Sequence, residues 1–377
     1  MKFVWIILLA VLLVAAIGIP VVYEGYIKNE TRDEFFFGVS FGGDTTEEAK
    51  LLIDRVKDYT NLFIINSYDI SIDEGSLDEI CQYLVDSDMY FMVFFDWISR
   101  EVYPWQQIWL DTAEERFGDK FLGVYLYDEP GGRQIDTGFW KGADNPGYNE
   151  TILDYSEAAE AFVTSIGSYN STEDVKSRNM QMFTSDYALY WFDYLAGYDS
   201  IFVELGWNHS RTTHIGLCRG AADVQGKDWG AIITWTYNEP PYLENGTEML
   251  QDLITAYRAG AKYVTVFNYP YDTAFGVLTD EHFEAMETFW HMTGSLENVE
   301  ADVAFVLPKD YGWGMRNPDD RIWFPWWGPD EYSAQIWSNL NKLLDMYGLR
   351  LDIIYDDPVF SFGEKYSEIY YWNSQIE

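Results

Sequence analysis

The sequence has few basic residues. Its 24 lysines and arginines stand against 62 aspartates and glutamates, which gives a formal net charge of −38 at pH 7. A surface of this sign repels the phosphate backbone of nucleic acids, so we expect no nucleic-acid partner. The excess of acid is typical of a solvated surface that aids solubility or tolerates salt.

Cysteine and histidine are also scarce, with two and four residues. Neither cysteine stands in a metal-binding spacing, and a structural role fits His209 and His214 better than ligation. We therefore expect no metal and no cofactor. Cys81 and Cys218 fall in helices that the pattern places far apart, so we expect free thiols and no disulfide. The sequence has no Walker loop, no G-x-G-x-x-G after a strand and no G-x-S-x-G elbow, which are the usual signals of phosphate and acyl chemistry.

One long run lacks charge altogether. Phe3–Tyr23 is uncharged, and about 20 apolar residues in a helix span the core of a bilayer. We expect a signal-anchor or transmembrane helix within residues 1–27 and a polar linker over 28–34. A cleaved signal peptide is the alternative, because the small residues Ala16 and Gly18 occupy plausible cleavage positions.

Five N-x-S/T sequons favour an outward-facing body, because N-glycosylation takes place outside the cytoplasm. They begin at Asn29, Asn149, Asn170, Asn208 and Asn245. The charges that flank the apolar run do not fix its orientation. The sequons therefore decide the expectation, which is a single-pass protein of the cell membrane with an extracytoplasmic main body.

Apolar strand-like runs alternate with helix-like runs for eight rounds. The expected strands are 35–41, 61–68, 90–97, 121–127, 180–185, 200–205, 230–237 and 262–269. Most are apolar almost throughout, as strands covered on both faces are. The helical patterns cover 46–59, 77–87, 106–116, 152–169, 188–198, 213–225, 249–259 and 280–293. Eight such pairs predict an α/β fold, a (β/α)8 TIM barrel over residues 35–296.

Residues 297–377 predict a small α/β extension after the barrel. Segments 301–307 and 351–355 have the pattern of buried strands, and 331–347 has that of a helix. The segment 311–330 carries four tryptophans among glycine, proline and aspartate. This mixture predicts a long irregular aromatic loop.

Carboxylates follow two of the expected strands directly. The fourth strand continues into Asp128-Glu129-Pro130, and the seventh into Asn238-Glu239-Pro240. Barrel enzymes build their active sites at this end of the strands. Glycoside hydrolysis requires one carboxylic acid that protonates the departing oxygen and a second carboxylate that attacks the sugar or activates water.

On these motifs, residues 35–296 resemble the large clan of (β/α)8 glycoside hydrolases whose acid/base follows the fourth strand and whose nucleophile follows the seventh. The resemblance implies Glu129 as the acid/base and Glu239 as the nucleophile of a retaining enzyme. The clan commonly has asparagine immediately before its acid/base, whereas this chain has Asp128 there. The charge of that neighbour alters the proton affinity of Glu129.

Other carboxylates compete for these roles. Glu204, near the end of the sixth strand, is the main competitor and can replace Glu239. Asp128 or Asp186 can serve if the enzyme inverts. A structural role is open for Glu129 and Glu239 as well, because a carboxylate at a strand end also caps the following helix.

Further polar and aromatic side chains end the expected strands, where carboxylates and amides bind sugar hydroxyls and flat rings cover sugar faces. Two long loops, 130–150 and 238–247, follow strands on the same face. The expected substrate-binding residues are Asp96, Trp97, Asp128, Asp186, Glu204, Trp207, Tyr237, Asn268 and Tyr269. Each ring is equally suited to ordinary packing.

Together these features predict a membrane-anchored, extracytoplasmic glycoside hydrolase or transglycosidase that acts on a polysaccharide or glycan. The alternative is a non-catalytic barrel that binds glycan or contributes to the cell envelope, because fold alone does not establish activity. A barrel hydrolase of some other bond is a third class. Two carboxyl groups that face one cleft distinguish the first class from the second.

Overall fold

The computed structural model describes residues 35–140, 152–271 and 273–376. The expected membrane helix at Phe3–Tyr23 and the linker at 28–34 lie outside these residues. Within the described ranges, no helix has the length and apolar character that crossing a membrane requires.

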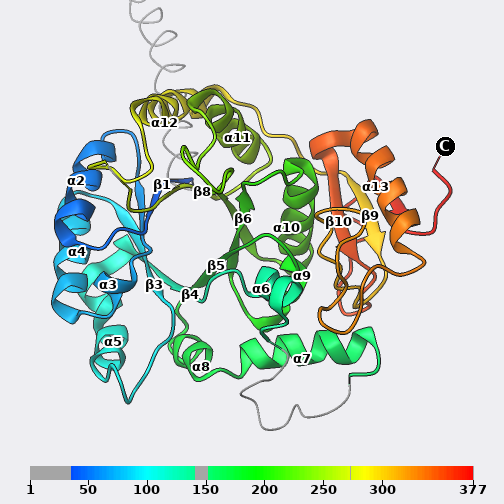
Figure 1. Cartoon of the computed structure of the whole chain (residues 1–377), viewed down its shortest axis with the longest axis horizontal. Coiled ribbons are helices and arrows are strands. Elements are labelled where there is room, and N and C mark those ends of the chain that lie inside the picture. The colour runs from blue at the N-terminus through cyan, green and yellow to red at the C-terminus, as the bar shows by residue number, and fades with distance from the viewer. Residues whose placement is uncertain (1–34, 141–151, 272, 377) are drawn as a thin grey trace, which may run out of the picture.

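Eight parallel strands close into a barrel in which each strand pairs with its sequence neighbours and β1 pairs with β8 (Figure 1). The strands are β1 (Phe36–Phe41), β2 (Leu62–Ile65), β3 (Tyr90–Phe95), β4 (Phe121–Leu126), β5 (Met182–Asp186), β6 (Ser200–Leu205), β7 (Asp228–Ile233) and β8 (Tyr263–Asn268). All eight expected strands are present, so the prediction of a (β/α)8 barrel is confirmed.

Helices cover the outside of the barrel between successive strands (Figure 1). Local sequence starts several of them, as at α2, where Thr45 and Glu48 form a reciprocal capping box. The helices are α2 (Thr46–Val56), α3 (Tyr68–Ser71), α4 (Glu74–Asp86), α5 (Trp105–Phe117), α6 (Pro130–Thr137), α7 (Tyr155–Gly167), α8 (Asn170–Lys176), α9 (Tyr190–Ala196), α10 (Arg211–Gln225), α11 (Gly246–Arg258) and α12 (Asp280–Met292).

The barrel interior has its own apolar core, separate from the larger core between strands and helices. Every second strand residue points inward, which is the alternation of a strand with two different faces. The inner core consists of Phe36, Leu62, Ile64, Met92, Phe94, Tyr125, Phe183, Phe202, Ile232 and Tyr263. The lumen is therefore filled, and polar side chains gather above this layer at the carboxyl ends of the strands.

Two expectations on this face are corrected. Residues 130–137 form helix α6 instead of the start of a long loop, because Pro130 suits the first turn of a helix. Strand β7 ends at Ile233 instead of Tyr237. The backbone N–H groups of Thr236 and Tyr237 both donate to the carbonyl oxygen of Tyr242, so this segment turns into a loop instead of continuing the ladder.

The C-terminal unit is a parallel sheet in the order β10-β9-β11, formed by β9 (Val303–Leu307), β10 (Leu351–Tyr355) and β11 (Glu368–Tyr371), with helix α13 (Ser333–Tyr347). The segment 311–330 between β9 and α13 is irregular, as expected. The sheet packs beside α10 (Figure 1). Arg219 of α10 donates to Oδ1 of Asp352 at 2.7 Å, and both side chains are buried. Removing one partner of such a pair costs about 3–5 kcal/mol, so the pair ties the unit firmly to the barrel.

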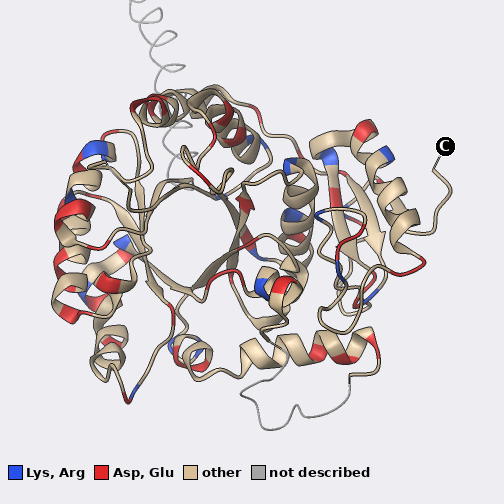
Figure 2. Cartoon of the chain, viewed as in Figure 1, with Lys and Arg blue, Asp and Glu red and all other residues tan. Residues whose placement is uncertain are grey.

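Two other sequence features are placed clearly. Cys81 lies on α4 and Cys218 on α10, and both thiols are buried and free. Acidic residues are distributed over the outer helices of the barrel and over the C-terminal unit (Figure 2). The negative charge is therefore spread over many elements instead of being confined to one segment.

Candidate active site

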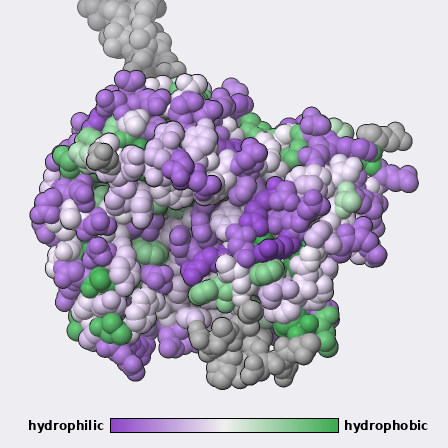
Figure 3. All heavy atoms as spheres, in the orientation of Figure 1, coloured by the Kyte–Doolittle hydropathy of each residue, from purple (hydrophilic) through white to green (hydrophobic). Residues whose placement is uncertain are grey.

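The carboxyl ends of β4, β5 and β6 bring four acidic side chains together. Asp128 and Glu129 are the second and third residues after β4, Asp186 ends β5, and Glu204 is the last residue but one of β6. Each of them influences the proton affinity of at least one of the others. Hydrophilic residues occupy the centre of the face seen along the barrel (Figure 3).

Glu129 and Glu204 form the centre of this group, because each carboxyl group acts on the pKa of the other. Glu204 is buried, and its Oε1 also accepts a hydrogen bond of 2.7 Å from Oγ of Ser185 on β5. Burial, together with the charges of Asp128 and Asp186, raises the pKa of Glu129 to about 8. Burial and the charge of Glu129 raise the pKa of Glu204 well above its usual value. The two groups therefore influence each other's ionisation and titrate as a unit.

Asp128 is tied to the barrel interior through Tyr125. The Tyr125 hydroxyl donates to Oδ1 of Asp128 at 3.0 Å and accepts from the backbone N–H of Ser185 at 2.9 Å. Burial raises the pKa of Asp128, and the hydrogen bond from Tyr125 opposes that rise. This aspartate is therefore held in place beside Glu129, where asparagine is common in the clan that the chain resembles.

Asp186 has a structural task at the start of α6. Its carboxylate accepts hydrogen bonds from four backbone N–H groups, those of Gly131 at 2.5 Å, Gly132 at 2.8 Å, Tyr187 at 2.7 Å and Ala188 at 3.1 Å. Burial raises the pKa of Asp186 to about 7, whereas these N–H groups lower it. Helix α6 has no side-chain cap of its own, so Asp186 supplies the acceptor that its first turn lacks.

The turn that carries Glu129 is held in an unusual conformation. Glu129 has a φ of 50°, in the left-handed region that residues other than glycine seldom adopt. The two glycines that follow permit close packing. A Cβ atom on Gly131 would lie 2.4 Å from the carbonyl oxygen of Ala188, and one on Gly132 would lie 2.2 Å from the ring of Tyr187. The packing around the turn holds this strained backbone in place.

Glu239 stands in the loop that follows β7. It comes six positions after Ile233, the last residue of β7, and its side chain is exposed. The carboxyl groups that act on the pKa of Glu129 are those of Asp128, Asp186 and Glu204. The assignment of Glu239 as the nucleophile stays a prediction, and Glu204, its main competitor, occupies the more suitable position.

Aromatic side chains lie around the rim. Trp97 is exposed and lines a cavity of about 700 Å³ between the β3–α5 loop and α8, close to the exposed Asp96. Trp207 and Tyr237 line a second cavity of about 580 Å³ between the loops that follow β6 and β7. These three rings have the exposure that stacking on sugars requires.

The remaining expected residues differ from each other. Tyr269 is exposed and packs its ring against Trp235 at a centroid distance of 5.5 Å. Asn268 is buried, and its side-chain amide donates to the carbonyl oxygen of Phe275 at 2.6 Å, which is a structural role. The rings of His209 and His214 stack at 5.2 Å, and burial lowers their pKa values to about 4 and about 3. Over the described ranges, no group of three or more potential ligands could hold a metal ion.

Ser185 and Tyr125 were not singled out from the sequence. The signal that could have identified Ser185 is the alternation along β5, because Phe183 of the inner core points into the lumen and Ser185 lies two positions later. The same spacing separates Glu204 from Phe202 on β6. Alternation therefore places both side chains on the inner face, directly above the apolar layer.

Comparison with solved structures identifies proteins of the same fold. A β-galactosidase from the Antarctic haloarchaeon Halorubrum lacusprofundi is 13% identical and has a TM-score of 0.56, over 89% of this chain and 69% of that one. A GH5_18 protein from Bifidobacterium longum subsp. infantis is 10% identical with a TM-score of 0.53, over 90% and 97%. A GH5_18 variant from Bifidobacterium longum subsp. longum, solved with Manβ1-4GlcNAc, is 10% identical with a TM-score of 0.51, over 90% and 96%.

No protein-family model and no curated protein sequence matches the chain. At identities of 10–13%, the structural likeness shows the fold. The resemblance to (β/α)8 glycoside hydrolases is thus confirmed as a likeness of architecture, without a specific family.

Proposed function

We propose that the protein is a glycoside hydrolase or transglycosidase that acts on a polysaccharide or glycan through Glu129 and Glu204. The observation that carries the proposal is the close pair of carboxyl groups at the mouth of the barrel, after β4 and at the end of β6, each of which acts on the pKa of the other. An acid/base pair of this kind is what glycosidic cleavage needs. The folds of a β-galactosidase and of a protein solved with Manβ1-4GlcNAc make β-galactosides and β-mannosides the first substrates to test.

In this proposal Glu129 is the general acid. With a pKa of about 8 it is protonated at neutral pH, as a group that donates to a departing oxygen must be. The exposed rings of Trp97 and Tyr237 and the half-buried ring of Trp207 supply stacking surfaces for neighbouring sugar units. Activity should therefore fall as the pH rises above about 8, because Glu129 then loses its proton.

Glu204 is the nucleophile in the same proposal. The hydroxyl of Ser185 donates to its Oε1 and so opposes the rise in pKa that burial and the charge of Glu129 cause. The two carboxyl groups act on each other's pKa and so lie close together, whereas an inverting enzyme keeps them roughly 6.5–9.5 Å apart to leave room for the water that it activates. This closeness favours a retaining mechanism, in which Glu129 later activates the water that releases the product.

The test is hydrolysis of a panel of aryl glycosides and polysaccharides by the wild-type protein and by Glu129→Gln, Glu204→Gln and Glu239→Gln. We expect the first two substitutions to lower kcat by about 10²–10⁴-fold or more and the third, at an exposed position, to leave most of the activity. Loss of activity in Glu239→Gln with normal turnover in Glu204→Gln would restore the assignment that the resemblance implied. A wild-type protein that binds glycans but cleaves none is a binding barrel.

We also propose that the enzyme is tethered to the cell membrane by the apolar segment Phe3–Tyr23, with its body outside the cytoplasm. The sequons at Asn170, Asn208 and Asn245 are exposed, which their glycosylation requires. Residue 35 enters β1 at the end of the barrel opposite the carboxyl pair, so a tether there leaves the mouth facing away from the bilayer. Protease treatment of intact cells tests the location. If the body survives a digestion that removes known surface proteins, the location is wrong.

A further inference from the structure

The C-terminal unit contacts the helix that begins at Glu129. Arg321 of the aromatic loop donates to the backbone carbonyl of Asp136 at 3.1 Å, and Gln134 of α6 donates to that of Phe324 at 2.5 Å. These contacts join segments almost 190 positions apart in the sequence. Because α6 starts at the proposed acid, the loop supports an element of the proposed active site.

Arg316 of the same loop contacts α6 through its side chain. Arg316 binds both carboxylate oxygens of Asp320, through Nε and Nη2 at 2.8 Å each, which fixes the plane of its guanidinium group. Its remaining Nη1 donates to Oδ1 of Asp136 on α6, also at 2.8 Å. The side chains of Arg316 and Asp320 are 15% and 3% exposed, so water screens the Arg316–Asp320 pair weakly.

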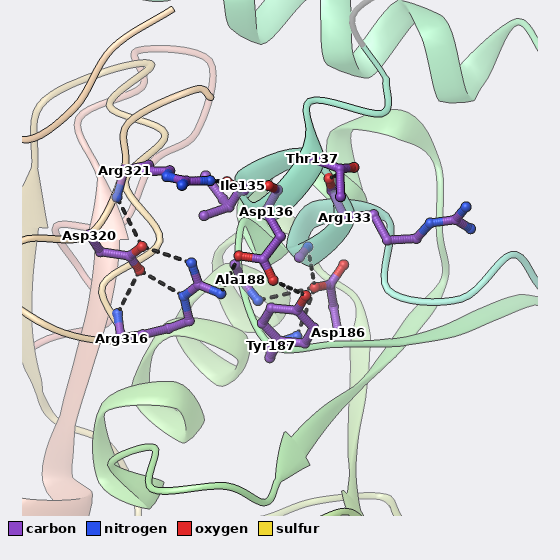
Figure 4. Close-up of polar contacts among 11 residues, drawn as sticks. Arg133, Ile135, Asp136, Thr137, Asp186, Tyr187, Ala188, Arg316, Asp320 and Arg321 are labelled. Carbon is purple, nitrogen blue, oxygen red and sulfur yellow. Dashed lines mark hydrogen bonds and ion pairs between the residues drawn. The ribbon is translucent and has the colours of Figure 1, made fainter. Parts of the chain in front are cut away.

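Asp136 also accepts a hydrogen bond from Tyr187. The Tyr187 hydroxyl donates to Oδ2 of Asp136 at 2.8 Å, so one carboxylate joins Arg316 and Tyr187 (Figure 4). Tyr187 directly follows Asp186, which caps the first turn of α6, and its ring occupies the space that Gly132 leaves open. The charge of Glu129 also acts on the Tyr187 hydroxyl, so the two side chains are near each other.

We propose that Arg316, acting through Asp136 and Tyr187, is a positioning residue for Glu129. We call these three side chains the Arg316 bridge. It holds α6 against the end of β5, and with it the strained turn that aims the Glu129 carboxyl at Glu204. The C-terminal unit is then part of the support of the active site. The role of the Arg316 bridge in catalysis rests on the proposed function. Its effect on the position of α6 and Glu129 can be measured without a substrate.

The first test is hydrogen exchange in α6 of the full-length protein. Arg316→Met keeps the aliphatic stem and removes every hydrogen bond of the side chain, and Arg316→Lys keeps the charge but cannot bind two carboxylates in one plane. We expect the amides of Gly131 and Gly132 to exchange at least about tenfold faster in both variants. The matched control is Arg350→Met, which removes an exposed ion pair with Asp302 in the same unit. Equal exchange in the Arg316 and Arg350 variants overturns the proposal.

The second test reads the position of Glu129. A looser turn admits water, so the pKa of Glu129 should fall from about 8 toward its ordinary value. The shift is followed by carbon NMR of the carboxyl resonance that disappears in Glu129→Gln. Tyr187→Phe removes one hydroxyl without changing any charge, and it decides the question if Arg316→Met does not fold. An unchanged titration in folded Tyr187→Phe and Arg316→Lys contradicts a positioning role.

Kinetics separate this inference from the proposed function. Once a substrate is known, the Arg316 variants should lose kcat with little change in KM, because the bridge lies behind the acid and not in the sugar cavities. If the wild-type protein cleaves no glycan, the proposed function fails, while exchange and titration still decide whether the bridge positions Glu129.

Discussion

At the scale of single residues, burial makes it costly for both carboxyl groups at the mouth, those of Glu129 and Glu204, to be ionised at once. The identity of Asp128 matters here. Asparagine at that position would leave Glu129 with one charged neighbour fewer, whereas Asp128 contributes the largest effect on the Glu129 pKa after burial. The sequence predicted that influence, and the structure gives its direction.

The raised pKa of Glu129 makes stability depend on pH. Its folded value of about 8 exceeds the ordinary value of 4.5 for a glutamate, so the protonated form stabilises the fold fully below pH 4.5 and this contribution is lost as the pH rises through 8. Asp186, with a folded pKa of about 7, acts in the same direction. We expect Glu129→Gln to gain at least about 1 kcal/mol of unfolding free energy relative to wild type between pH 5 and pH 9, because an amide does not ionise.

Denaturant titrations at several pH values measure this difference, and Glu239→Gln is the control because its side chain is exposed. A difference between Glu129→Gln and wild type that stays constant from pH 5 to pH 9 would show that Glu129 is not perturbed in the folded protein.

At the scale of elements, the turn between β4 and α6 shows what a sequence reveals locally. The motif Asp128-Glu129-Pro130 was found because it directly follows an apolar strand, and the structure keeps it there. The end of β7 was placed less well. Thr234 to Tyr237 continue the β-branched and aromatic pattern of β7, so propensity extended the expected strand to Tyr237, although the backbone N–H groups of Thr236 and Tyr237 pair within a loop.

The close packing of α6 predicts sensitivity at Gly132. An added Cβ atom would lie 2.2 Å from the Tyr187 ring, so Gly132→Ala must displace α6 or that ring. Overpacking of this kind costs about 1–3 kcal/mol of unfolding free energy. Thermal and denaturant unfolding measure the loss.

Gly75→Ala in α4 is the matched control for this substitution. There the added atom meets only a side-chain oxygen of Asp73 at 3.5 Å, and alanine favours a helix. Equal stability of Gly132→Ala and Gly75→Ala would mean that α6 tolerates displacement.

At the scale of the whole molecule, the barrel was predictable because eight buried parallel strands leave eight apolar runs in the sequence. The C-terminal unit was partly predictable for the same reason, through β9, α13 and β10. Strand β11 was missed, because Glu368–Tyr371 is short and half exposed and has no apolar run. The contacts of Arg316 with Asp136 and Asp320 could not be predicted from the sequence, because a local sequence pattern contains no information on which charged side chains meet in the fold.

The charge of the whole chain gives a further prediction. Acidic residues outnumber basic ones by 62 to 24, so repulsion between surface carboxylates outweighs attraction. Salt screens this repulsion, with a Debye length that falls from about 10 Å at 0.1 M to about 3 Å at 1 M. We expect Tm at neutral pH to rise between 0.1 and 1 M potassium chloride. A fall in Tm over this range would show that the exposed ion pairs contribute more than the repulsion does.

The central claim is that Glu129 and Glu204 are the catalytic pair, and trapping the covalent intermediate tests it most directly. Fluorinated sugars with a good leaving group, in the galacto, manno and gluco configurations, form the glycosyl-enzyme of a retaining glycosidase but release it slowly. The protein is incubated with each reagent, digested and sequenced by mass spectrometry. Our account predicts that the label is attached to Glu204 and that Glu204→Gln acquires none. A label on Glu239 would contradict it.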